Sequence, residues 1–124
     1  MKEIEVRDFM AQGTACEGLV RNLEDGNFVH AYLITGQEGV GKRTLAREVA
    51  RYLLCTGDHR PCGVCPACQQ ILQGTHPDVL MVRPGFHVSS DIPTDRGKND
   101  IIVETIREVV SMVNEHGYAS SMRI

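Results

Sequence analysis

Four cysteines lie close together in the chain, and they are the residues whose type and spacing most directly indicate chemistry. Cys55, Cys62, Cys65 and Cys68 follow the spacing C-x6-C-x2-C-x2-C. Thiolates bind Zn²⁺ tetrahedrally, and four protein ligands leave no open position for a substrate. A C-x2-C spacing also lets one tight turn present two sulfurs to one ion. The pattern therefore predicts a structural zinc module over residues 55–68.

Two other uses of these cysteines stay open at the level of the sequence. An iron–sulfur run would need a further cysteine four places after Cys68, and the chain has Leu72 there. Redox exchange by a C-x2-C pair would need the motif at the start of a helix that follows a strand, which the sequence does not predict here. Cys16 stands apart from the cluster and is interpreted as an ordinary thiol.

A second group of residues matches a phosphate-binding loop. Residues 36–42 read G-Q-E-G-V-G-K, the first seven positions of the Walker A pattern. Glycines allow a tight turn whose backbone N–H groups face phosphate oxygens, and Lys42 would reach the β- and γ-phosphates. The predicted nucleotide-binding residues are Gly36, Gly39, Val40, Gly41, Lys42, Arg43 and Thr44.

The eighth position of that pattern argues against efficient hydrolysis. It should carry a hydroxyl that binds magnesium, but Arg43 occupies it and Thr44 comes one place late. One residue along a helix is about 100° of rotation, so Thr44 does not replace the missing ligand. We expect a loop that holds phosphate, with ATP and Mg²⁺ left open as cofactors and no catalytic residue. The alternative is a glycine turn that binds nothing.

Hydrophobic spacing predicts the elements that position these residues. The expected helices cover residues 12–25, 42–55, 68–73 and 102–116, and the expected strands cover 30–35 and 78–82, with another strand beginning within 118–124. This alternation indicates an α/β domain with a parallel sheet. Residues 84–100 are polar and contain two prolines and two glycines, so we expect a mobile loop there.

Several side chains within these elements receive predictions of their own. Arg43, Arg47 and Arg51 recur every four residues and are interpreted as a solvated helix face, with a phosphate-facing stripe as the alternative. The five histidines are interpreted as structural. Apolar residues share one face of the last helix: Ile102, Ile106, Val109, Val110 and Val113.

Composition excludes several classes of protein. The chain has 124 residues, 42% hydrophobic and 23% charged, with a net charge of −3. This is one small domain without a basic field, so any DNA contact would be local or made by a larger assembly. No apolar run approaches about 18 residues and no secretory signal is present, so we expect no membrane partner and a cytoplasmic location.

Together these motifs resemble a known family. Residues 30–36, the loop at 36–42, the four cysteines and the segment 74–78, which reads G-T-H-P-D, are similar to the clamp-loader ATPases of bacterial DNA polymerase III. The resemblance covers residues 12–118. It implies a P-loop NTPase of the AAA+ type, with a parallel sheet and helices on both faces. Residues 1–124 would form its N-terminal part, with the zinc module as an insert.

Within that family, two features are similar to the delta-prime branch. They are residues 97–109, and Arg43 at a position where the gamma/tau motor keeps a hydroxyl. The resemblance implies a subunit of the polymerase III holoenzyme that helps load the sliding clamp on primed DNA, with weak or no ATP hydrolysis of its own. The implied partners are the gamma/tau and delta subunits and, through the assembly, the sliding clamp and primer–template DNA.

Two alternatives remain beside the delta-prime interpretation. One is an ATP-hydrolysing motor subunit of the gamma/tau type, and the other is an unrelated P-loop kinase or transferase with a zinc lid. The acidic Walker B strand and the arginine finger of the family have no counterpart within residues 1–124. We therefore expect this chain to be an N-terminal fragment or a truncated gene product, and not itself catalytic.

Overall fold

The structure is a computed structural model that describes residues 2–6, 14–86, 99–115, 117, 119–120 and 122–124. Two compact units divide the chain, Met1–Gln73 and Gly74–Ile124. Among the described residues, no helix has the length and apolar character needed to cross a membrane. The loop expected at 84–100 falls mostly outside the described residues.

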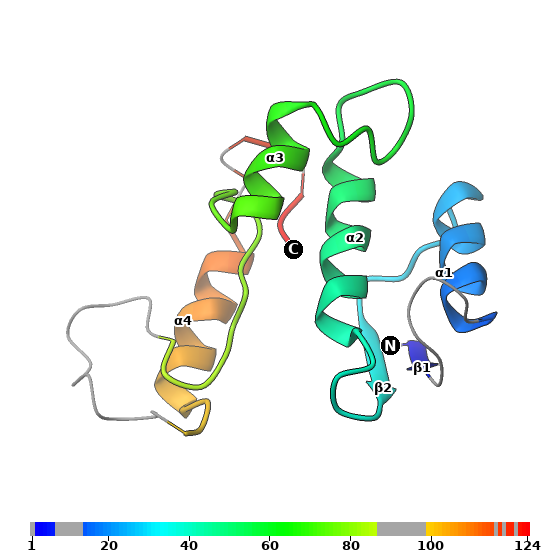
Figure 1. The fold of residues 1–124 in the computed structure, drawn as a ribbon. Helices are drawn as coiled ribbons and strands as arrows, with labels where there is room; N and C mark the ends of the chain where they lie inside the picture. The colour runs from blue at the N-terminus through cyan, green and yellow to red at the C-terminus, as the bar shows by residue number, and fades with distance from the viewer. Residues whose placement is uncertain (1, 7–13, 87–98, 116, 118, 121) are drawn as a thin grey trace. The chain divides into compact units, whose positions relative to one another are not determined.

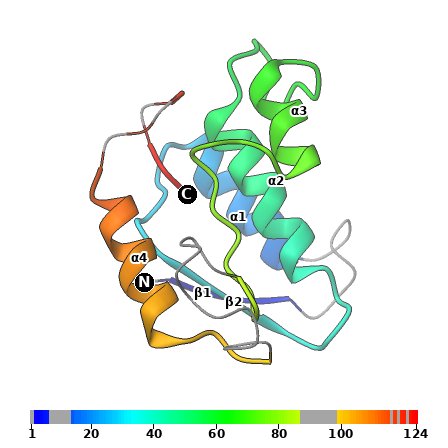
Figure 2. The same ribbon diagram turned by 90° about the vertical axis from the view of Figure 1, so that its left-hand side faces the viewer.

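The first unit begins with a strand, a helix and a second strand. β1 (Lys2–Val6) and β2 (Tyr32–Gly36) pair in parallel, with Ile4 opposite Ile34, and Figure 2 shows them side by side. α1 (Thr14–Glu24) lies between them in the chain. Two parallel strands need such a crossover because a tight turn cannot join their ends. β2 overlaps the strand expected over residues 30–35 and extends one residue beyond it, whereas β1 was not predicted.

α2 (Lys42–Leu54) follows β2 after a short glycine-rich turn, as Figure 1 shows. Its apolar face is buried as the periodicity predicted. Leu45 meets Leu19 and Leu23 of α1 in the core of this unit. Burying each leucine side chain contributes about 1.5–3 kcal/mol. Partly buried side chains complete the cluster: Tyr32, Ile34, Val40, Val49, Tyr52 and Leu53. This packing fixes both ends of the glycine-rich turn.

α3 (Pro66–Gln73) packs against α2. The loop that joins the two helices, here called the cysteine loop (residues 55–65), carries three of the four cysteines, and Cys68 lies in α3. The helix was predicted to begin at Cys68. It begins earlier because proline suits the first helical position, where no N–H is needed and φ is already helical. Gly74 follows the helix with φ 72°, a left-handed conformation that ends helices and costs glycine little.

In the second unit, α4 (Val103–Val113) is the one regular element among the described residues. The prediction of a strand over 78–82 was wrong, since those residues form no strand. Their backbone is still paired once: Leu80 N–H donates to the Ile124 carbonyl at 2.7 Å, and Ile124 N–H donates to the Asp78 carbonyl at 2.8 Å. This is the hydrogen-bond pattern of a single parallel bridge. One bridge does not make a ladder, which explains the difference.

The buried face of α4 is not the predicted apolar face. Thr105 is 1% exposed and its hydroxyl donates to the Phe86 carbonyl at 3.1 Å, whereas Ile106, Val110 and Val113 are 46%, 55% and 57% exposed. The carbonyl partner lets a polar residue take the buried position. The helix also ends earlier than predicted, with Asn114 as its C-cap.

Candidate metal centre and phosphate loop

The four predicted cysteines come together between α2 and α3: three lie in the connecting loop, and Cys68 lies in the first turn of α3. Their sulfurs all lie within 4.8 Å of one another, and those of Cys55 and Cys65 are 4.0 Å apart. Ligands at about 2.3 Å from one tetrahedral ion would lie about 3.8 Å apart. All four cysteines are free thiols. The cluster is therefore compact enough to hold one metal ion.

Backbone N–H groups donate to three of the sulfurs. Gly57 and Cys62 each donate to Cys55 Sγ at 3.3 Å. Cys65 donates to Cys62 Sγ at 3.2 Å, and Cys68 donates to Cys65 Sγ at 3.4 Å. Each of these last two bonds closes one C-x2-C turn, so the two turns share Cys65. Such donors favour the thiolate, which is the form that binds metal.

These surroundings separate the pKa values of the thiols. The N–H of Cys68 is the main reason why the pKa of Cys65 falls to about 5. The pKa of Cys55 is also lowered, chiefly by the N–H of Cys62. Burial instead raises the pKa of Cys68 to about 11. A bound cation would offset the cost of burying a thiolate and would therefore ionise Cys68. The four sulfurs thus suit a metal ion better than they suit four neutral thiols.

Gly57 lets the loop fold against the cluster. A Cβ at this position would lie 2.8 Å from Cys62 Cβ, 2.9 Å from Cys62 Sγ and 3.6 Å from Cys55 Sγ. A real Cβ does not approach other atoms as closely as 2.8–2.9 Å, so a larger residue here would displace Cys62, one of the four thiols. The sequence analysis did not identify Gly57, because a close approach between segments has no local signature.

The position of Cys65 bears on the redox alternative left open by the sequence. Cys65 directly precedes α3, and its carbonyl accepts the N–H of Gln69 at 3.1 Å. The first part of the condition for redox exchange, a helix start at the motif, is therefore met. The element before this loop is α2 rather than a strand, however, and the sulfurs gather as a set of four. The arrangement still favours metal binding.

The predicted phosphate loop is a tight turn between β2 and α2. Gly36, Gly39 and Gly41 have φ of 147°, 78° and 99°, in the region that favours glycine. Lys42 is the first residue of α2, and its Nζ donates to the carbonyls of Gly36 and Gln37 at 2.7 Å each. The ammonium group is therefore held against the turn, next to the N-terminus of the helix.

The other predicted residues of this loop lie in different surroundings. Val40 is partly buried against the core of the first unit. Arg43 and Thr44 are exposed on the first turn of α2. The prediction of a solvated arginine face holds for Arg43 but was wrong for Arg51. The side chain of Arg51 is only 13% exposed, because it folds against the cysteine loop and pairs with Glu48.

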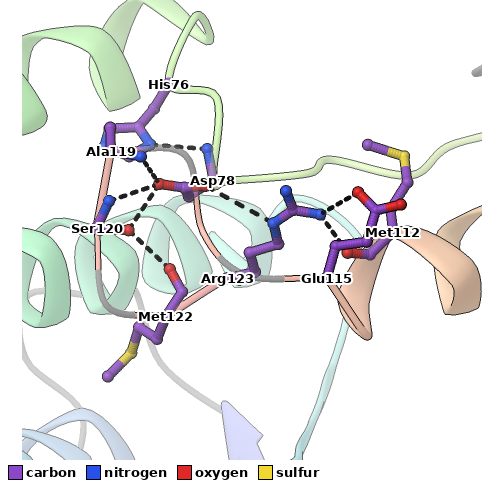
Figure 3. Close-up of polar contacts among 8 residues, drawn as sticks. All are labelled: His76, Asp78, Met112, Glu115, Ala119, Ser120, Met122 and Arg123. Carbon is purple, nitrogen blue, oxygen red and sulfur yellow. Dashed lines mark hydrogen bonds and ion pairs between the residues drawn. The ribbon is translucent and has the colours of Figure 1, made fainter.

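Sequence reasoning missed a buried carboxylate in the second unit. Asp78 Oδ2 accepts hydrogen bonds of 2.8 Å from the N–H groups of Ala119 and Ser120, and the Ser120 hydroxyl is also 2.8 Å away (Figure 3). That hydroxyl is 2.7 Å from the Met122 carbonyl as well, so its one proton serves one acceptor at a time. Asp78 Oδ1 lies 3.7 Å from Nε of Arg123.

The same network includes His76 and the end of α4. The buried His76 accepts the N–H of Asp78 at Nδ1 over 3.1 Å, which assigns the ring proton of a neutral imidazole to Nε2. Arg123 donates to the Met112 carbonyl and lies 3.8 Å from Glu115, as Figure 3 shows. The prediction that histidines are structural agrees with His76, while His87 and His116 lie outside the described residues.

The part of the chain that carries the cysteine cluster and the glycine-rich turn is similar to known proteins. A family profile described as "DNA polymerase III, delta subunit" matches residues 11–124. The chain is 34% identical to DNA polymerase III subunit delta' of Escherichia coli over 110 residues, which cover 87% of this chain and 30% of that protein. It is 38% identical to subunit delta' of Pseudomonas aeruginosa over 89 residues, covering 68% and 23%.

A further relative is DNA polymerase III subunit tau of Escherichia coli, 40% identical over 77 residues, which cover 60% of this chain and 12% of that protein. No solved structure matches the chain closely. The chain thus spans less than a third of the length of each of these relatives. The family profile, by contrast, covers nearly all of the chain. The chain therefore belongs to the DNA polymerase III delta subunit family.

Proposed function

We propose that this chain forms the P-loop portion of a delta-prime subunit of DNA polymerase III, in the clamp loader that places the sliding clamp on primed DNA. The family match over residues 11–124 carries this proposal. The delta' relatives from Escherichia coli and Pseudomonas aeruginosa cover 87% and 68% of the chain, against 60% for subunit tau of Escherichia coli. The expected partners are the gamma/tau and delta subunits and, through them, the clamp and primer–template DNA. The cytoplasm is the expected location because replication takes place there.

We also infer that the glycine-rich turn at 36–42 is a phosphate loop of an AAA+ domain. Supporting this are the positive φ angles of its glycines, its place between β2 and α2, and the position of Lys42. A phosphate would exchange the two carbonyl contacts of Lys42 for its own oxygens, near the positive end of the α2 dipole. Arg43 offers magnesium no oxygen, so we expect nucleotide binding with weak or no hydrolysis.

The cysteine cluster is proposed to hold a structural zinc ion through all four sulfurs. Supporting this are the sulfur spacing within 4.8 Å and the N–H donors that favour thiolates. When bound, the ion would neutralise part of the thiolate charge and tie the loop to α2 and α3. The protein residues fix the ligands: Gly57 admits the close approach, and the two C-x2-C turns aim the sulfurs.

Reconstitution with partner subunits tests the assignment. The chain, extended to its full gene where that is longer, is mixed with tau and delta subunits and analysed by size-exclusion chromatography with light scattering. We expect a stable complex that supports ATP-dependent clamp loading on primed DNA. A chain that joins no complex with these subunits would refute the delta-prime assignment.

The second candidate is a motor subunit of the gamma/tau type, which the identity to subunit tau supports. Nucleotide binding distinguishes it from delta-prime. A fluorescent ATP analogue is titrated with and without Mg²⁺, and Lys42→Ala serves as the control. Delta-prime predicts weak binding that changes little with Mg²⁺, whereas a motor predicts tight Mg²⁺-dependent binding and steady hydrolysis. None of the relatives described above gives support to a kinase or transferase.

A further inference from the structure

Arg51 lies between a carboxylate on its own helix and the cysteine loop. On one side its Nη1 donates to Glu48 Oε1 at 2.7 Å, one helical turn back along α2. On the other side the guanidinium faces the cysteine loop, since a Cβ built at Gly63 would lie 3.4 Å from Arg51 Nη2. Gly63 has φ 77° and belongs to the turn between Cys62 and Cys65. The arginine therefore bridges α2 and the cysteine loop.

Glu48 pairs with only one nitrogen of the buried Arg51 guanidinium. The side chain is 13% exposed, and among the described residues its Nε is buried with no hydrogen-bond partner. Glu48 is the only acidic side chain that the described structure pairs with Arg51, and the other side of the guanidinium faces the turn at Gly63. A buried guanidinium N–H without a partner is costly, so an anionic cluster on the open side of Arg51 would stabilise the side chain.

A metal-loaded cluster would be such an anion. Four thiolates and one divalent ion carry a formal charge of about −2, most of it on the sulfurs. Cys68 is the wholly buried ligand and the one that Arg51 approaches. A cation in contact with this sulfur reduces the repulsion among the ligands without competing for the metal. Groups behind the ligands commonly change metal affinity by about 10- to 100-fold.

We propose that Arg51 is a positioning residue of the cysteine centre, which holds the Cys68 thiolate in place and offsets the negative charge of the metal-loaded cluster. Glu48 aims the guanidinium, and Gly63 leaves the space that it occupies. The proposal rests on the zinc site proposed above. It gives one arginine of α2 a role in metal binding that its position in the sequence and its charge do not indicate.

Metal titration of matched variants tests this role. Zn²⁺ affinity is measured by competition with a chromophoric chelator, and Co²⁺ is used to record the thiolate-to-metal absorption band. Arg51→Met removes the charge and keeps most of the apolar stem, while Arg51→Lys keeps a charge. Arg47→Met, one turn earlier on the same helix, is the matched control. Circular dichroism of the metal-free forms checks that each variant folds.

We expect Arg51→Met to bind Zn²⁺ about 10- to 100-fold more weakly than the original protein and to release it faster. Arg51→Lys should recover part of this loss, and Arg47→Met should bind as the original protein does. The Co²⁺ band of Arg51→Met should keep its tetrathiolate intensity but shift in energy. If Arg51→Met fails to fold, Glu48→Gln replaces it, because it releases the guanidinium without removing it and should weaken binding several-fold.

Two results would overturn the inference, and they are distinguishable. Equal Zn²⁺ affinity in Arg51→Met, Arg47→Met and the original protein would show that Arg51 takes no part, while the metal site itself stands. An original protein that binds no stoichiometric Zn²⁺ or Co²⁺ would refute the metal site and this role together, and would leave the clamp-loader assignment to be judged by reconstitution.

Discussion

Replacing Asp78 with asparagine should destabilise the second unit while leaving its shape unchanged. The side chain of Asp78 is completely buried, and its Oδ2 lies 2.8 Å from the N–H groups of Ala119 and Ser120 and from the Ser120 hydroxyl. Asparagine has nearly the same volume but no charge. It can keep an oxygen toward the two N–H groups only by turning its NH₂ toward Arg123.

The expected size follows from these contacts. Hydrogen bonds to a charged group contribute about 1.5–3 kcal/mol, against about 0.5–1.5 kcal/mol for neutral pairs. Weakening three of them should therefore cost about 3 kcal/mol, less whatever Ala119, which is an exposed residue, recovers from water. Loss of the carboxylate next to Arg123 adds to this cost. Because a small domain is stable by only about 5–15 kcal/mol, the effect is large.

Urea unfolding followed by circular dichroism measures this change. With a slope of about 1–3 kcal/mol per molar urea, a loss of about 3 kcal/mol should lower the midpoint by about 1–3 M. Hydrogen exchange should also become faster in residues 119–124, where the donors lie. Asp100→Asn is the matched control, because Asp100 is exposed and should shift the midpoint hardly at all. A midpoint for Asp78→Asn that equals the Asp100→Asn value would refute the reasoning.

Four further predictions concern the first unit. Gly57→Ala should weaken Zn²⁺ binding at least tenfold in a chelator competition, because its Cβ would meet Cys62. Gly18→Ala, by contrast, places its methyl group in open space on α1, so it should raise the free energy of unfolding by about 0.5–1 kcal/mol in a urea titration. Arg43→Thr restores the hydroxyl of the Walker A pattern and should make binding of a fluorescent ATP analogue depend on Mg²⁺; unchanged binding would count against a phosphate loop. In metal-free protein the pKa of Cys65 is lowered to about 5 and that of Cys68 is raised to about 11, so iodoacetamide at neutral pH should label Cys65 first, and that labelling should slow as the pH falls through about 5. Peptide mass spectrometry shows the order, and equal labelling of both cysteines would contradict it.

The features predicted well from the sequence are those with a local signature. The spacing of the cysteines predicted a cluster that the structure assembles, and the apolar periodicity of α2 predicted its buried face. The family resemblance drawn from these motifs is confirmed by the family match. Each depends on neighbours within a few residues, where helix geometry and turn chemistry act.

The features that were missed depend on distant partners or on weaker local signals. Asp78 is separated from Ala119 and Ser120 by 41 and 42 residues, so no local pattern could show that it would be buried. Thr105 is buried because the Phe86 carbonyl meets it, against the apolar pattern of its helix. β1 did have a local signal, since Ile4 and Val6 alternate with charged residues, but the high charge obscured it.

α2 gives the two proposed sites a common support with separate ends. The helix has 13 residues and is therefore about 20 Å long. Lys42 is at one end, and at the other Cys55 N–H donates to the Arg51 carbonyl, so the last turn can unwind only if a ligand thiol moves. Amide exchange in the last turn should thus report whether the sulfurs share an ion, and exchange in the first turn whether phosphate is present. One hydrogen-exchange experiment would then report metal binding at the C-terminal end of α2 and phosphate binding at its N-terminal end.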